Sequence, residues 1–220
     1  MTGRRSGLDA RTRALVRLSA ALTADADTLE AAMDEAAAVD PGAAEEVLLQ
    51  GYLFLGYPVA LNALGLWRRQ TGRPPPAAAP ADPAAWRARG EDVCRAVYAH
   101  QYEALREVMA GIHPDLDRWA VVEGYGKVLG RPGLELRLRE LCIVALLSGI
   151  DAHRQLHAHL RGCLNVGASA DEVAAVLAEV APMVGTARAT VAAGVWERVR
   201  QRQPGGSPAD GAAGPDVAER

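Results

Sequence analysis

Glu140 and His159 are the two residues whose types and spacing point most directly to chemistry. They are nineteen residues apart, on two segments that are otherwise rich in Leu, Ile, Val, Ala and Cys. A carboxylate among apolar residues needs a partner or a purpose, because burial disfavours its charged form. An imidazole on the next segment could exchange a proton with it, as general acid–base catalysis requires. The alternative is a structural hydrogen bond between two helices.

Helical periodicity predicts that both side chains face the interior. Segment 135–149 places its apolar residues on one helix face, and Glu140 falls within that face. Segment 151–166 has a core face of its own, with His159 on its edge. Two short helices joined by a tight turn pack antiparallel. We therefore expect the two side chains to meet in one cleft.

Composition predicts an all-α fold. Half of the 220 residues are hydrophobic, but only 5% are aromatic, and Ala dominates. Ala and Leu favour helices, and no segment alternates with period two for long enough to predict a strand. The expected helices cover residues 9–22, 25–38, 42–70 with a bend at Pro58, 83–111 weakened at Gly90, 114–128, 135–149, 151–166, 170–183 and 186–202.

The chain divides at two segments without helical periodicity. A Pro/Ala-rich linker is expected at 71–83 and a disordered tail at 203–220. Residues 11–21 match residues 137–147 in apolar rhythm and arginine spacing, which indicates an old duplication. On this interpretation, 8–70 is a degenerate first repeat and 84–202 the second.

Charge and cysteine content favour a cytoplasmic protein. The formal net charge is −3 and the arginines are dispersed, so no nucleic-acid partner is expected. No apolar run is long enough for a membrane span. The three cysteines are odd in number and lack CxxC spacing, which fits reduced thiols. His153 and His157 have metal-ligand spacing, but no further ligand is evident, so neither a metal nor a cofactor is expected.

From Tyr98 to Val195 the chain resembles the carboxymuconolactone decarboxylase-like family, which includes the alkylhydroperoxidase D type. The resemblance rests on HPDLDRWAVVEGYGKVLGRPGLELRLRELCIVALL (113–147), QLHAHLRGCLNVGAS (155–169) and DEVAAVLAEVAPMVG (171–185). It implies a helical bundle of the alkylhydroperoxidase D-like type, a homo-oligomer and a small-molecule substrate.

The peroxidase branch of this family uses a Glu, a CxxC pair and a His. By resemblance, Glu140 and His159 match the catalytic Glu and His, whereas the two cysteine positions fall on Ala152 and Gln155. Peroxidase chemistry would then have to use Cys142 or Cys163, because both usual thiols are missing.

The decarboxylase branch acts on a carboxylated γ-lactone, and it is our leading interpretation. It implies loss of CO₂ with return of a proton to carbon, relayed by Glu140 and His159. The expected substrate-binding residues are Arg131 for a carboxylate, Tyr125 as a hydrogen-bond donor, and His157. Arg131 could instead staple helix ends, and His157 could lie at an oligomer contact. A non-catalytic binding or scaffold module is the remaining alternative.

Overall fold

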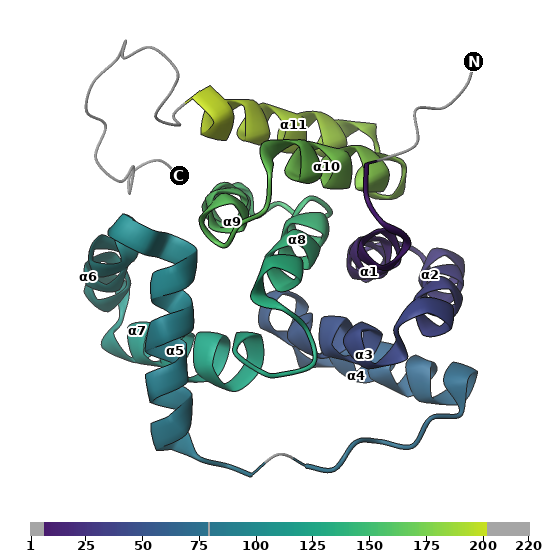
Figure 1. Ribbon diagram of the computed structural model, residues 1–220, viewed down its shortest axis with the longest axis horizontal. Helices are drawn as coiled ribbons and strands as arrows, with labels where there is room; N and C mark the ends of the chain where they lie inside the picture. The colour runs from purple at the N-terminus through teal and green to yellow at the C-terminus, as the bar shows by residue number, and fades with distance from the viewer. Residues whose placement is uncertain (1–6, 79, 202–220) are drawn as a thin grey trace.

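The protein folds as a bundle of helices, as the computed structural model in Figure 1 shows. Residues 7–78 and 80–201 are described, and this part contains no strand. The all-α prediction is therefore confirmed. The tail predicted at 203–220 lies outside the described residues.

The helices begin and end close to the predicted positions. Aspartate N-caps explain several of the starts: Asp9, Asp25, Asp40 and Asp82 each accept a hydrogen bond from a backbone N–H in the first turn. Residues 72–78 and 80–82 lie outside any helix, between α4 and α5. The elements are α1 (Ala10–Ala21), α2 (Ala26–Val39), α3 (Pro41–Gln50), α4 (Tyr52–Thr71), α5 (Pro83–Tyr98), η1 (Ala99–Gln101), α6 (Tyr102–Ile112), α7 (Pro114–Trp119), η2 (Ala120–Leu129), α8 (Leu136–Leu147), α9 (His153–Asn165), α10 (Ala170–Val184) and α11 (Thr186–Gln201).

The long helix predicted at 42–70 is two helices. The chain turns by 114° between α3 and α4, at Gly51, and breaks again at Gly56, where φ is 78°. Only glycine adopts that φ without strain. The predicted bend at Pro58 was therefore placed two residues late. Pro58 lies in the first turn after the break, where its missing N–H costs nothing.

The helix predicted at 83–111 is also divided, but at Ala99 rather than at Gly90. Ala99 has a φ of 49° and opens the short 3₁₀ helix η1, after which α6 leaves in a new direction. Gly90 lies inside α5 and is buried. The sequence pattern predicted a weak point in the helix at Gly90, whereas the structure has a close contact between two helices there.

Two glycines allow α5 and the helix η2 to touch through their backbones. A Cβ atom on Gly90 would collide with the carbonyl oxygen of Val121, and one on Gly126 with that of Trp86. The element η2 is a π-helix, in which the Gly130 N–H donates to the Tyr125 carbonyl at 2.7 Å. This wider turn replaces the regular helix predicted at 114–128. It sets the direction in which the Tyr125 side chain enters the interior.

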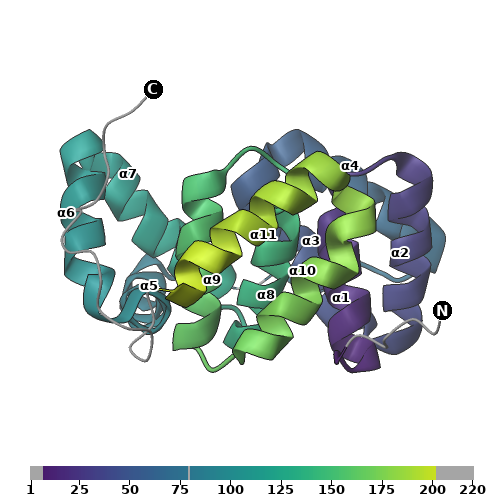
Figure 2. The same cartoon turned by 90° about the horizontal axis from the view of Figure 1, so that it is seen from above.

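Helix α8 is the centre of the molecule. It packs against α1, α9 and α10, and every residue from Leu138 to Leu147 is buried (Figures 1 and 2). The prediction of one inward face on this segment was therefore too narrow. A helix covered on all sides buries its whole circumference, and Glu140 and Arg139 are buried with it.

The two segments matched in the proposed duplication pack against each other as α1 and α8. The Ser19 hydroxyl of α1 donates to the Cys142 carbonyl of α8 at 2.6 Å. The duplication itself, and the division into repeats, stay predictions.

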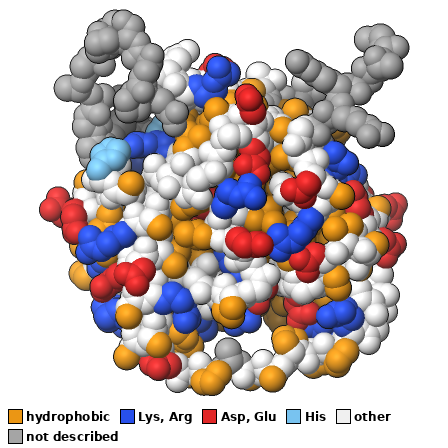
Figure 3. All heavy atoms as spheres, in the orientation of Figure 1, with side chains coloured by type: hydrophobic (Ala, Val, Ile, Leu, Met, Phe, Trp, Pro, Cys, Tyr) orange, Lys and Arg blue, Asp and Glu red, His pale blue; other side chains and the backbone are white. Residues whose placement is uncertain are grey.

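No single described helix has both the length and the apolar composition to cross a membrane, and only the sharply bent pair α3 and α4 meets that criterion jointly. On the face seen in Figure 3, acidic and basic side chains are intermixed with hydrophobic ones.

Candidate active site

The structure brings Glu140 and His159 into direct contact. The Nδ1 atom of His159 lies 2.8 Å from Oε2 of Glu140, so α8 and α9 are joined by a hydrogen bond between these side chains. Glu140 is completely buried, and His159 is 5% exposed. The sequence correctly predicted that the two side chains meet, and the structure buries both of them where a cleft was expected. The pair lies beneath the surface, because helices cover α8 on all sides.

Both partners keep one polar atom without a hydrogen bond. Oε1 of Glu140 is buried and has no partner among the described residues. The only hydrogen bond of the His159 ring to that part of the chain is the one at Nδ1, so Nε2 has no such partner. An ionised Glu140 would accept the Nδ1 proton and leave a lone pair on Nε2. Unsatisfied polar atoms are rare in buried sites and mark places where a ligand or water belongs.

Gly162 creates the space that the carboxylate occupies. A Cβ on this residue would lie 2.7 Å from Oε2 of Glu140 and 2.8 Å from Cγ1 of Val97. Any larger side chain on α9 would push the carboxylate away from His159. The glycine is therefore part of the geometry of the pair.

Two tyrosine hydroxyls lie near this carboxylate. The hydroxyl groups of Tyr98 and Tyr125 are 2.9 Å apart, and their rings meet edge to face. Burial raises the pKa of both phenols, and the charge of Glu140 raises the pKa of each further. Both side chains are therefore neutral hydroxyls at physiological pH. Tyr125, predicted as a substrate-binding residue, is in the same interior region as the pair.

Phe54 of α4 packs against His159, although no sequence pattern singled it out. The edge of one ring meets the face of the other, with centroids 5.8 Å apart and planes at 78°. The first half of the chain thus contributes a side chain to the site. Phe54 is the single Phe in the sequence, but nothing in its local pattern indicates a contact with residue 159.

The three cysteines are buried thiols. Burial raises the pKa of Cys94 and of Cys142 to about 12 and also raises the pKa of Cys163. The thiolate is the reactive form, so such cysteines are poor nucleophiles at neutral pH. Glu140 adds to the effect at Cys163, where its charge further disfavours a thiolate.

Arg131 is engaged away from the pair. Its guanidinium donates hydrogen bonds of 2.9–3.1 Å to the carboxylate of Glu46. The same carboxylate accepts a bond of 2.8 Å from the fully buried Arg139. This ionic cluster ties α3 to the start of α8, which is the stapling alternative considered for Arg131. We therefore assign no substrate role to Arg131 below.

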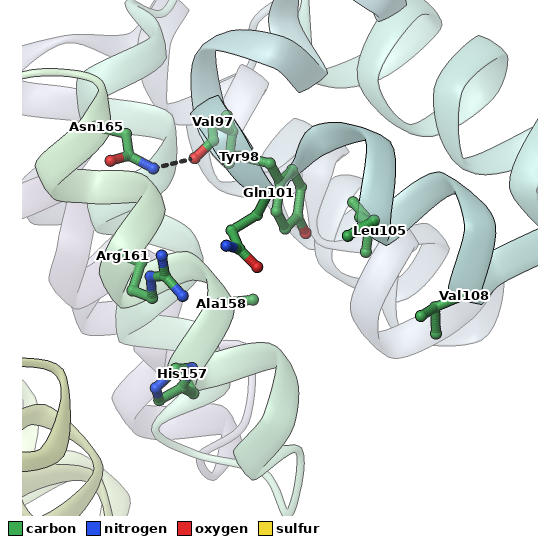
Figure 4. A pocket seen from close by; sticks show the side chains of 10 residues that line it. Val97, Tyr98, Gln101, Leu105, Val108, His157, Ala158, Arg161 and Asn165 are labelled. Carbon is green, nitrogen blue, oxygen red and sulfur yellow. Dashed lines mark hydrogen bonds between the residues drawn. The ribbon is translucent and has the colours of Figure 1, made fainter. Parts of the chain in front are cut away.

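His157 is on another side of α9 from His159. It is half-buried and lines a groove together with Arg161, one turn further along the helix (Figure 4). The structure does not bring His157 to the pair. Among the described residues, no three His, Cys, Asp or Glu side chains are arranged to hold a metal ion.

The arrangement can hold and move one proton. The carboxylate fixes the imidazole through Nδ1, and this contact stabilises the imidazolium that forms when Nε2 takes up a proton. The fold and the pair together define a class by structure: all-α proteins with a carboxylate–imidazole contact buried between two helices.

The comparison with protein families agrees with this class. A family model described as the carboxymuconolactone decarboxylase family matches residues 114–198, which include Tyr125, Glu140 and His159. This part of the chain belongs to that family. No curated protein matches the chain.

Proposed function

We propose that the protein is an enzyme of the carboxymuconolactone decarboxylase type that moves a proton on a small carboxylated lactone or a related carbonyl compound. The observation that carries the proposal is the buried contact of 2.8 Å between Glu140 and His159, with Oε1 and Nε2 left without partners among the described residues. In a purely structural pair, the buried oxygen Oε1 would be expected to accept a further hydrogen bond.

In the proposed reaction, the C–C bond to a carboxylate breaks and CO₂ leaves. The electron pair stays on the substrate carbon, where the neighbouring carbonyl delocalises it, and protonated His159 then delivers a proton from Nε2 to that carbon. Glu140 holds the ring through Nδ1 and stabilises its charged form. A neutral Tyr125 hydroxyl supports negative charge on the carbonyl oxygen.

Because His159 is only 5% exposed, the substrate must displace a covering side chain. Phe54 is our candidate, since its ring lies against the imidazole and is itself half-buried. The backbone break at Gly56, two residues further on, gives this segment freedom to move.

The test is turnover of carboxymuconolactone and related carboxylated lactones by variants of the pair. Glu140→Gln and His159→Gln should each lower kcat by about 10²–10⁴-fold, the range that general acid–base groups contribute. Glu103→Gln is the matched control, because it makes the same change at an exposed carboxylate outside the site. It should keep kcat within about threefold of the wild type, since the control residue makes no contact with the reacting groups. Equal turnover by all four proteins would refute the proposal.

The peroxidase alternative gains no support from the thiols. Cys142 and Cys163 are completely buried, and burial keeps both protonated.

A further inference from the structure

A groove between α9 and the α5–α6 corner carries features that the proposed reaction does not use. It has a volume of about 210 Å³, below the roughly 300–1,000 Å³ of pockets for drug-sized ligands, so its ligand is small. Figure 4 shows His157, Ala158, Arg161 and Asn165 of α9 on one side, Leu105 and Val108 of α6 on the other, and Gln101 between them.

The lining is apolar along α6 and positively charged along α9. Ala104, Leu105 and Val108 supply the apolar side, and no Asp or Glu lines the groove. Arg161 is half-buried, yet it makes no hydrogen bond or ion pair with any residue that the structure describes. Two other half-buried arginines have carboxylate partners: Arg131 pairs with Glu46, and Arg106 with Asp117.

Because Arg161 has no partner among the described residues, its guanidinium is available to an anion in the groove. Arginine binds carboxylates through two parallel hydrogen bonds, so a carboxylate is the anion that its shape fits. The amide of Gln101 supplies further polar contacts at the same end of the groove.

We infer that this groove binds a small monocarboxylate with an apolar body. The carboxylate is held by Arg161, and the apolar body lies along Ala104, Leu105 and Val108 of α6. A second carboxylate at the far end of the ligand would lie beside these apolar side chains, so dicarboxylates should bind more weakly. The groove adjoins the proposed reaction centre through its wall residues Val97 and Tyr98, but neither Glu140 nor His159 lines it.

The probes are three compounds of one chain length: octanoate, its dicarboxylate counterpart suberate, and the neutral octan-1-ol. In calorimetric titration, the wild-type protein should bind octanoate saturably and bind the other two at least about tenfold more weakly. Octan-1-ol lacks the charge-assisted bidentate contact, and suberate would have to place its second carboxylate beside apolar side chains. Failure of octanoate to bind, or suberate binding as tightly as octanoate, would overturn the inference.

The variants locate the site. Arg161→Gln should weaken octanoate binding by about tenfold or more, whereas Arg154→Gln, an exposed arginine on the same helix, should leave it unchanged. Ala158→Phe keeps the charge of Arg161 but fills the groove, so it should abolish octanoate binding. This second variant tests the site if Arg161→Gln fails to fold. Equal binding by Ala158→Phe and the wild type would also overturn the inference.

The inference is independent of the proposed reaction. Glu140→Gln should bind octanoate as the wild type does, because Glu140 does not line the groove. If turnover survives Glu140→Gln while Arg161→Gln loses octanoate, the proposed function fails and the groove stands. If octanoate does not bind while Glu140→Gln loses turnover, the groove inference fails and the proposed function stands.

Discussion

At the scale of single residues, the site is defined by polar atoms that the fold leaves without partners. Glu140 is completely buried with one hydrogen bond to His159, and its second oxygen has none within the described residues. Burial of a carboxylate costs stability unless it is fully hydrogen-bonded. We propose that Glu140 is kept in this state for function, at the expense of folding stability.

This cost of the buried carboxylate predicts the effect of Glu140→Gln on the free energy of unfolding. The amide has nearly the same shape and no charge to desolvate, so the variant should be as stable as the wild type or up to about 2 kcal/mol more stable. Urea unfolding followed by circular dichroism measures the difference. Under the same conditions Glu46→Gln should lose about 3–5 kcal/mol, because it leaves the buried Arg139 without its carboxylate. A loss at residue 140 as large as that at residue 46 would mean that the Glu140 pair is structural.

The sequence predicted the pair but not its surroundings. Glu140 and His159 could be found because a polar residue interrupts an apolar helical face, which is a local signal. Phe54 and Arg161 gave no such signal, since their roles depend on which distant helices pack against α9. Arg131 was predicted to bind a substrate because its actual partner, Glu46, is 85 residues away and could not be recognised from the sequence.

At the scale of elements, the sequence predicts which segments are helical but not where the helices break. Propensity and N-caps identify helices well, because both act within one turn. The breaks at Gly51, Gly56 and Ala99 depend on how helices meet, which no local pattern records. Gly90 shows the difference most clearly, since it permits a crossing of α5 and η2 instead of weakening α5.

Gly90→Ala should therefore destabilise the protein strongly. In an open helix this change is stabilising by up to about 1 kcal/mol, but here the methyl group would meet the carbonyl of Val121. We expect a loss of about 3 kcal/mol or more, at or above the upper end for overpacking, because backbone cannot move aside as a side chain can. Gly111→Ala is the matched control: it is helical and exposed, with open space around it, and should be neutral or slightly stabilising. Thermal unfolding of the two variants compares them directly, and similar melting temperatures would contradict the crossing.

At the scale of the whole molecule, one central helix explains both the fold and the burial of the site. Helix α8 packs against α1 from the first half of the chain and against α9 and α10 from the second, so the two halves share one core (Figure 1). The family match covers residues 114–198 and so includes α8 and α9 but not α1–α4. Phe54 and Glu46 show that the unmatched half supports the site and its central helix.

The family resemblance predicts a homo-oligomer. Tyr57 and Leu61 of α4 are one helical turn apart and about two-thirds exposed, beside an apolar hollow of about 340 Å³. Exposed apolar residues grouped in this way mark association surfaces. Light scattering after size exclusion should show more than one copy, and the double variant Tyr57→Ser, Leu61→Ser should shift the protein toward monomer. Val191→Ser, at an isolated exposed position, should leave the assembly unchanged. A monomeric wild-type protein would remove this prediction without affecting the site.

The central claim is that Glu140 and His159 act as one catalytic unit, and a double-mutant cycle on kcat/KM for a turned-over lactone tests it most directly. Residues that act as a unit give non-additive losses. The account predicts that Glu140→Gln combined with His159→Gln is no slower than His159→Gln alone, within about threefold. Losses that multiply in the double variant, or single variants that turn over as the wild type does, would contradict it.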